Sequence, residues 1–536
     1  MESAQPTEPL LRKNTTPVPL NVWCAAGLAV LLRAIPFLIT QVSTPAAGTA
    51  FVPIGYNPKD WLAYAGIIKN NLNSDGFFLA NPFTTEPQAG SFILLYHSVL
   101  GYIHRISGID IFWLLELSRA PLIFLLIFIL WRFLEDVLPD VRTRSWACWL
   151  VALGGGLEFL ILPFADFLSP DIAAVTRQEL WHLQGWNTFE SFYNPLWIAA
   201  LCLTLWVLRP IFQSAPLRTV QQLSLALCFL VLFYTHPYSA IVAATVLVCH
   251  PLLCWLLRQP VNLERLWRMG LALAPVLAII GAVSLWQRQD AVFKTCSGGV
   301  FGVQALPVFW YPVALGAVGA LALRGLAAWT RDAHPDRFAL GAWLIAIVFL
   351  HTSTVLNGYH FVFHLFIPVS VLAASGLADS VVAAGKLRHA RAALWLAACF
   401  ISPLYVTYQS VQDVNARSKT SLLYLNILEK LKALPAGNVL APAQLGGLIP
   451  AYTPHRVYVG QWFLSPNYLE RSKQYTTLVE TVPNDAAALL RLIDSQQIAY
   501  VVVPGARVTA FCNTLGTRVL KVERVNQAAI VSLKLK

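Results

Sequence analysis

Long apolar runs recur along almost the whole chain, and they constrain its fold more than any other feature. A helix that crosses a membrane needs about 20 consecutive, mostly apolar residues. Of the 536 residues, 57% are hydrophobic and only 12% are charged, which is too apolar and too poor in charge for a soluble globular protein. The sequence therefore predicts an α-helical polytopic membrane protein.

About eleven segments meet the length and hydropathy requirement for a span. The first run is too long for a signal-peptide core and has no small-residue cleavage site after it, so we expect an uncleaved first helix. The expected spans cover residues 20–40, 110–134, 145–164, 195–213, 220–238, 239–257, 268–286, 306–328, 338–356, 361–384 and 391–409.

Basic residues lie in alternate loops between these spans. The positive-inside rule assigns such loops, and the amino terminus with them, to the cytoplasm. Everything after residue 410 is then expected on the outer face. The formal net charge of +11 is spread over many short loops, whereas a nucleic-acid binder would concentrate it, so no nucleic-acid partner is expected. The basic residues are Arg142, Arg144, Arg209, Arg218, Arg258, Arg265, Arg268, Arg324, Arg331, Arg337, Lys386, Arg388 and Arg391.

The chain divides into two predicted domains. Residues 1–410 form the transmembrane domain, with a first outer loop at 42–109 and a second at 165–195. Residues 411–536 alternate short helical and strand patterns, which predicts a soluble extracytoplasmic α/β domain. The expected helices are SLLYLNILEKLKAL and DAAALLRLIDSQ, and the expected strands are NVLAP, RVYVG, IAYVVVP, TRVLKVERV and AAIVSLKLK.

The first outer loop contains two amphipathic stretches, KDWLAYAGIIKNNL and QAGSFILLYHSVLGYIHRI. Such stretches are typical of helices that lie along the membrane interface. The alternative makes the second stretch a genuine span, which gives twelve spans and turns the tail inward. The distribution of basic loops argues against that alternative.

Several outer-face residues could carry chemistry. Asp60 lies just past the first span, beside Lys59 and four residues before Tyr64; it is either a solvated loop acid or a general base. The second outer loop supplies Asp166 and Glu190. Lys294 lies in a third outer loop, at 287–305.

Charged side chains inside spans are costly, so each one asks for a reason. Arg33 either snorkels to the interface or binds a lipid phosphate. Glu116 and Arg119 are three residues apart, which favours an intrahelical pair. His360 and His364 could be metal ligands or buried core histidines, and the absence of a third ligand nearby in sequence favours the core interpretation.

Nine cysteines lie mostly inside apolar runs, with no CxxC pair or other metal-type spacing. Free cysteine in such a setting behaves as a small hydrophobic residue. The sequence therefore indicates neither a disulfide framework nor a zinc site, and we expect no cofactor.

The order of these features resembles the GT-C superfamily of integral-membrane glycosyltransferases, and in particular its bacterial branch similar to protein mannosyltransferases and aminoarabinose transferases. DWLAY resembles the family's Asp-Glu-x-x-Tyr motif, and Glu86-Pro87 leads into the interfacial helix as it does in the family. A span begins around Ser118-Arg119-Ala120-Pro121. YHFVFHLFIPVSVLAASGLA and NVLAPAQLGGLIPAYTPHRVYVGQW resemble a late helix and a tail segment of bacterial members.

The resemblance implies a polyprenyl-phosphate sugar as donor and a lipid, glycan or protein acceptor, with inverting transfer on the outer face of a bacterial inner membrane. Asp60 would be the general base. The donor phosphate would be bound, in descending order of expectation, by Arg33, Arg119, Lys294 and His360. Asp166 and Glu190 would position the acceptor or supply a second acid, and Lys59, Tyr64 and Glu86 would also contact substrate.

Two departures from the family pattern change these expectations. Trp61 stands where the family has a second acid, so we expect one essential carboxylate and no paired-acid metal site. His360 stands where many members have arginine.

The rival hypothesis is a lipid or polysaccharide transporter with a docking domain. Transporters usually show internal repeats and matching broken helices, and neither is visible here.

Overall fold

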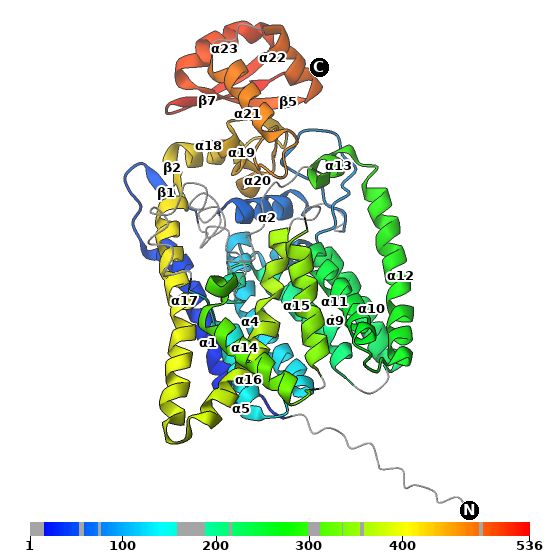
Figure 1. Ribbon diagram of the computed structural model, residues 1–536. Helices are drawn as coiled ribbons and strands as arrows, with labels where there is room; N and C mark the ends of the chain where they lie inside the picture. The colour runs from blue at the N-terminus through cyan, green and yellow to red at the C-terminus, as the bar shows by residue number, and fades with distance from the viewer. Residues whose placement is uncertain are drawn as a thin grey trace, which may run out of the picture.

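The computed structural model describes residues 16–52, 58–72, 77–157, 188–213, 217–298, 311–334, 336–353, 358–481 and 486–535. A bundle of long helices makes up most of the molecule, and a small domain with a β-sheet caps one end of it (Figure 1). This architecture agrees with the predicted polytopic membrane domain followed by an α/β domain.

Within the described residues, seven helical segments are long and apolar enough to cross a membrane. All seven coincide with predicted spans, although α17 continues past residue 410. They are α1 (Leu20–Val42), α4 (Ile111–Val137), α9 (Pro195–Leu208) with η2 (Arg209–Phe212), α11 (Pro237–Leu256), α12 (Leu263–Gln287), α16 (Phe366–Ala383) and α17 (Arg388–Arg417).

The other four predicted spans are also helical in their described parts. They contain α5 (Val141–Leu153), α10 (Thr219–Thr235), α14 (Tyr311–Arg331) and α15 (Arg337–His351). Helices α5, α10 and α15 are shorter than a typical span. Helix α14 is interrupted at Gly316, whose φ of 48° and ψ of −129° are not helical. Glycine suits this conformation because it lacks a Cβ.

Close backbone packing joins α14 to α16 in the centre of the bundle. A Cβ on Gly325 would lie 1.9 Å from the carbonyl oxygen of Leu372, and a Cβ on Gly376 would lie 2.0 Å from that of Leu321. Small residues at such positions allow membrane helices to pack backbone against backbone. The two glycines therefore fix how closely these helices approach.

The first described residues lie at the end of the bundle remote from the small domain (Figure 1). The hydroxyl of Thr16 donates to the Glu135 carboxylate at 2.8 Å, near the carboxyl end of α4. Arg209 forms an ion pair with the neighbouring Asp136 at 2.7 Å. The N-terminal region and a basic loop thus share one end of the bundle.

The two helices predicted in the first outer loop are present as α2 (Pro58–Asn70) and α3 (Leu95–Ser107), with 13 residues each. A helix of that length extends about 20 Å, whereas the hydrocarbon core is about 30 Å thick. Each of these helices is shorter than a full span, as α5 also is with 13 residues, and the choice between eleven and twelve spans stays a prediction.

The small domain contains every strand and helix predicted for it. Its five-stranded sheet has the order β4-β3-β5-β7-β6, with parallel pairing of β3 to β4 and β5, and antiparallel pairing of β7 to β5 and β6. The helices α21 (Tyr468–Tyr475) and α23 (Val508–Leu515) were not predicted. The predicted elements are α18 (Leu422–Lys432), β3 (Asn438–Leu440), β4 (Arg456–Val457), α22 (Ala486–Ser495), β5 (Ile498–Pro504), β6 (Val519–Val525) and β7 (Ala528–Leu533).

A second, two-stranded sheet ties the first outer loop to the start of the tail. Strand β1 (Thr49–Phe51) pairs antiparallel with β2 (Lys419–Ser421). The two strands directly follow α1 and α17, whose helices also pack together. This pairing holds the beginning of the outer loop beside the beginning of the small domain.

Candidate active site

Helix α2 lies across the end of the bundle, beneath the small domain (Figure 1). Its sequence buries Trp61, Ala65 and Ile68, which share one helical face because residues about four apart point the same way. Proline at the first position, Pro58, suits a helix start. Asp60 follows in the first turn, where the helix dipole favours a negative charge.

The carboxyl of Asp60 is half-buried. Loss of solvation on burial raises its pKa to about 6, and the nearby positive charge of Lys59 opposes part of that rise. At neutral pH the group is mostly ionised, yet it is a stronger base than an ordinary aspartate. These are the properties that a general base needs near its working pH.

The buried face of α2 contacts the ends of the membrane helices that lie beneath the small domain. The Trp61 ring lies 5.5 Å from the guanidinium carbon of Arg119 on α4. The Asn194 amide, at the start of α9, donates to the Tyr64 hydroxyl at 3.3 Å. The helix that carries Asp60 is thereby placed over α4 and over the junction between α8 (Thr188–Ser191) and α9.

Arg119 is the centre of a buried polar group under α2. Its guanidinium donates to the Glu116 carboxylate, to the Arg33 carbonyl at 3.1 Å and to the Tyr193 carbonyl at 2.9 Å. The Glu116–Arg119 pair is therefore the intrahelical pair that the sequence predicted. We call Arg33, Glu116, Arg119 and Tyr193 the arginine cluster.

Arg33 lies in the same group, near the outer end of α1. Its guanidinium carbon is 5.3 Å from the centre of the Phe189 ring and 5.8 Å from that of Tyr193. One of its nitrogens donates to the Ser410 hydroxyl on α17 at 3.5 Å. With 3% of its surface exposed, Arg33 is held between protein groups rather than snorkelling into the interface.

Glu190 also reaches this region, because it sits on α8 next to Phe189 and is buried. The structure joins Arg33 and Arg119 directly. It places Trp61, the neighbour of Asp60, beside Arg119, and Phe189, the neighbour of Glu190, beside Arg33. Asp166, the other acid predicted from the second outer loop, lies outside the described residues.

Glu86 lies away from the cluster, at the boundary between the first outer loop and the small domain. Its carboxylate forms an ion pair with Arg471, and its carbonyl accepts from Arg456 at 2.6 Å. Arg471 also donates to the Thr84 hydroxyl at 3.2 Å and to the Tyr458 carbonyl at 3.1 Å. These contacts give Glu86 a structural position in the described chain.

Further hydrogen bonds from the small domain reach α2 and the segment after it. Gln461 donates to the carbonyl of Lys59 at 2.6 Å, next to Asp60, while the Lys59 side chain is exposed. Asn70 donates to the Pro450 carbonyl at 2.8 Å, and Asn81 donates to the Leu464 carbonyl at 2.7 Å. Together with the Glu86 contacts they form the loop–tail interface, which fixes α2 from above.

The remaining predicted site residues lie elsewhere. Lys294 is exposed on α13 (Ala291–Gly298), a helix that contacts Leu464 of the small domain through Cys296. His360 stacks on Tyr238 with ring centres 4.3 Å apart.

Metal binding finds no support in the described part of the chain. No group of three or more His, Cys, Asp or Glu side chains there could hold a metal ion. His364 is fully buried and its Nε2 lies 2.9 Å from the Ser239 hydroxyl, so it is a core histidine that makes a hydrogen bond.

His97 on α3 is a buried residue for which no role was predicted. Its ring lies 4.5 Å from that of Tyr64, and neither ring nitrogen has a hydrogen-bond partner among the described residues. Burial lowers its pKa to about 4, so the ring is neutral at pH 7. The only sequence signal for it was a histidine interrupting an apolar helix face.

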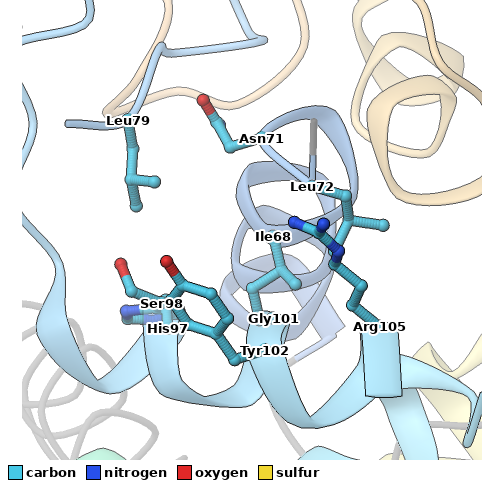
Figure 2. Close-up of a pocket in the computed structure, with 9 residues that line it drawn as sticks. All are labelled: Ile68, Asn71, Leu72, Leu79, His97, Ser98, Gly101, Tyr102 and Arg105. Carbon is cyan, nitrogen blue, oxygen red and sulfur yellow. The ribbon is translucent and has the colours of Figure 1, made fainter. Parts of the chain in front are cut away.

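A small cavity of about 30 Å³ adjoins His97. Figure 2 shows it between the end of α2, with Ile68 and Asn71, and the α3 residues His97, Ser98 and Tyr102. A polar cavity of this size can hold a water molecule. Such a water would supply the hydrogen bond that the His97 ring nitrogens lack. We therefore interpret the cavity as part of the packing around His97 and not as a substrate site.

Comparison with known proteins gives structural relatives only. No protein-family model and no curated protein sequence matches the chain. The crystal structure of ArnT from Cupriavidus metallidurans in the apo state is 15% identical, with a TM-score of 0.52 over 95% of this chain and 98% of that one. The cryo-EM structure of the arabinofuranosyltransferase AftD from Mycobacteria is 16% identical, with a TM-score of 0.51 over 96% of this chain and 40% of that one.

Both similarities extend over nearly the whole chain, so they cover the helix bundle, the first outer loop and the small domain together. At these identities they define the fold and leave the chemistry to the residues of the site. The chain therefore shares the fold of these two solved structures, which is the GT-C fold that the resemblance in its sequence implied.

Proposed function

We propose that this protein is a glycosyltransferase that moves a sugar from a polyprenyl-phosphate donor to a hydroxyl group of a lipid, glycan or protein acceptor. The reaction takes place on the outer face of a bacterial inner membrane, with the N-terminus cytoplasmic and the small domain extracytoplasmic. The fold supports glycosyl transfer, since one similar solved structure is named as an arabinofuranosyltransferase.

The observation that carries this proposal is the contact between the helix that bears Asp60 and the arginine cluster. A half-buried carboxylate with a pKa of about 6 lies one residue from Trp61, whose ring covers the guanidinium of Arg119. A base and buried cations are thus held by adjoining elements at the end of the membrane helices. Transfer from a phosphate to a hydroxyl needs both.

In the proposed reaction the acceptor oxygen attacks the anomeric carbon from the side opposite the phosphate. The new carbon–oxygen bond forms as the bond to the phosphate oxygen breaks, which inverts the configuration. Asp60 takes the hydroxyl proton, and the leaving phosphate keeps the electron pair. Arg33 stabilises the charge that develops on that phosphate.

The other predicted residues take supporting roles in this proposal. Arg119 has its two terminal guanidinium nitrogens bound to Glu116 and to two carbonyls, so it mainly holds α1 against α4 and the segment before α9. Glu190 positions the acceptor, as does Asp166. Tyr64 and Lys59 flank the base, and Lys294 and His360 are weaker candidates for phosphate contact because they lie on other elements.

The test is a transfer assay with purified full-length protein and a panel of radiolabelled polyprenyl-phosphate sugars. We expect Asp60→Asn to lower kcat by about 10²- to 10⁴-fold, the usual contribution of a general base. Glu470→Gln removes an exposed carboxylate on α21 and serves as the control with unchanged activity.

Full activity of the Asp60→Asn variant would show that the base is another group. A protein that turns over no lipid-linked sugar, but moves labelled lipid across vesicle membranes, would be the transporter of the rival hypothesis.

A further inference from the structure

A large groove opens at the end of the bundle remote from Asp60. It has a volume of about 740 Å³, within the range of small-molecule sites. Its walls come from the first turn of α1, from α5 and from α17, whose lower ends lie close together in Figure 1. Pro19, Asn21, Asp140, Val141, Arg142, Ser145, Trp146, Trp149, Leu396 and Phe400 line it.

The sequence of α5 places a mixed polar and aromatic stripe on the groove. Arg142, Ser145, Trp146 and Trp149 are spaced by three, one and three residues, which puts them on one helical face. Leu396 and Phe400 are likewise four apart on α17. The groove is therefore apolar along its length and polar at the mouth, where the first turns of α1 and α5 begin.

The back of the groove is closed by aromatic contact between the two helices. The rings of Trp149 and Phe400 have their centres 5.8 Å apart. Both side chains, like Trp146 and Leu396, are only partly buried, so they still present surface to whatever fills the groove. Because α1 and α17 are long and apolar enough to cross a membrane, we expect that surface to face lipid and not bulk water.

Arg142 differs from the neighbouring arginines at this end of the molecule. Arg144 and Arg209 form salt bridges with Glu135 and Asp136. Among the described residues, no carboxylate forms a salt bridge with Arg142. Its guanidinium carbon lies 4.7 Å from the centre of the Trp146 ring.

Asp140 is the acid at the mouth; it caps the helix, and its charge also interacts with that of Arg142. Its carboxylate accepts hydrogen bonds from the Thr143 backbone N–H at 2.8 Å and from the Thr143 hydroxyl at 2.6 Å. These bonds make it the cap of α5. The exposed cation at the mouth is thus Arg142, stacked on the tryptophan that forms one wall.

We propose that this groove binds one anionic glycerophospholipid, with an acyl chain along Trp146, Trp149 and Phe400 and the phosphate on Arg142. Basic pockets between membrane helices recognise anionic headgroups in this way, and tryptophan is favoured at the level of the headgroups. The site is separate from Asp60 and does not depend on the proposed transfer reaction.

Native mass spectrometry of the full-length protein in detergent tests the site. The protein is titrated with phosphatidylglycerol or with phosphatidylcholine of the same acyl chains. We expect the first phosphatidylglycerol to bind more tightly, and Arg142→Gln to weaken it about fivefold, the contribution of one basic residue near the membrane surface. Arg142→Lys should keep most of the preference.

Two further variants locate the site. Arg388→Gln removes an exposed arginine at the start of α17 that does not line the groove, and it should leave the preference unchanged. Leu396→Trp fills the groove and should weaken both lipids alike. Size-exclusion profiles identical to wild type show that each variant is folded.

Three results would overturn the proposal. One is equal binding of the two lipids to the wild-type protein, and another is an equal loss in the Arg142→Gln and Arg388→Gln variants. The third is displacement of phosphatidylglycerol by a polyprenyl phosphate at much lower concentration, which would assign the groove to that lipid instead.

Discussion

The arginine cluster and the loop–tail interface each contain an arginine–glutamate pair. The two pairs differ in how deeply they are buried and in how far apart their residues lie in the sequence. Arg119 and Glu116 expose 5% and 7% of their side chains and are neighbours on one helix. Arg471 and Glu86 expose 8% and 31% and come from different domains. The first pair lies below α2 and the second lies above it.

This difference assigns the two pairs different tasks. A pair buried at the end of membrane helices cannot lose one partner without leaving a charge away from water. A pair with a partly exposed carboxylate can be rehydrated when it breaks. The cluster therefore sets the position of the membrane helices, whereas the interface holds the helix that carries Asp60 and tolerates movement.

The largest expected effect is loss of stability in Arg119→Gln, which leaves Glu116 buried without its cation. Breaking a buried pair in this way costs about 3–5 kcal/mol, measured as a lower unfolding temperature in detergent. The double variant Glu116→Gln with Arg119→Gln should recover part of the loss, because no unpaired charge remains. If Arg119→Gln unfolded at the same temperature as the wild type, the buried pair would be no more important for stability than the partly exposed Glu86–Arg471 pair.

The next effect is on activity and concerns Arg33, the second arginine of the cluster. Arg33→Gln should lower kcat/KM by about 10²-fold, as when one donor to a developing charge is removed, with a smaller change in unfolding temperature than Arg119→Gln. Arg33→Lys keeps the charge and should recover part of the activity. Equal stability losses in the Arg33 and Arg119 variants would make Arg33 a structural residue.

A smaller effect is expected at the loop–tail interface. Glu86→Gln should cost about 1–2 kcal/mol, the range of a charge-assisted hydrogen bond, and it should speed hydrogen exchange in α2. The control is Glu523→Gln, which breaks the Lys521–Glu523 pair on β6 and should leave exchange in α2 as it is. Unchanged hydrogen exchange of α2 in both variants would show that the loop–tail interface does not hold the helix that carries Asp60.

The smallest effect is a shift in pH dependence. The deprotonated form of Asp60 is the active one, so kcat/KM should rise with pH and level off above a midpoint near the pKa of about 6. Lys59→Gln should move that midpoint upward, because Lys59 lowers the pKa of Asp60. A midpoint near 4 in the wild-type protein would mean that Asp60 is solvated during turnover.

Much of the fold could be predicted because its elements are encoded locally. The β-branched run IAYVVVP favours a strand through its own composition, and it forms β5. The apolar runs before residue 410 form helices at nearly the predicted places. The break at Gly316 and the end of α5 at Leu153 were not predicted, because both depend on how neighbouring helices pack. The helices α21 and α23 were missed because each has only eight residues, too few to show a clear helical repeat of apolar residues.

The site was predicted in part. The sequence singled out Asp60, Arg33 and the Glu116–Arg119 pair, since a charge in or beside an apolar run is a local signal. It could not show that the Arg119 guanidinium binds the Arg33 carbonyl, that Gln461 reaches the backbone of Lys59, or that His97 packs on Tyr64. It also placed Glu86 among the substrate contacts, and the structure pairs it with Arg471.

The sequence by itself determined that the chain crosses a membrane many times and ends in an α/β domain, because hydropathy and strand periodicity are properties of short segments. Only the tertiary structure decided which charges meet, since partners such as Glu86 and Arg471 are hundreds of residues apart. Their pairing depends on helix packing and on the β1–β2 contact that sets the small domain above α2. The same packing partly buries Asp60 and thereby raises its pKa.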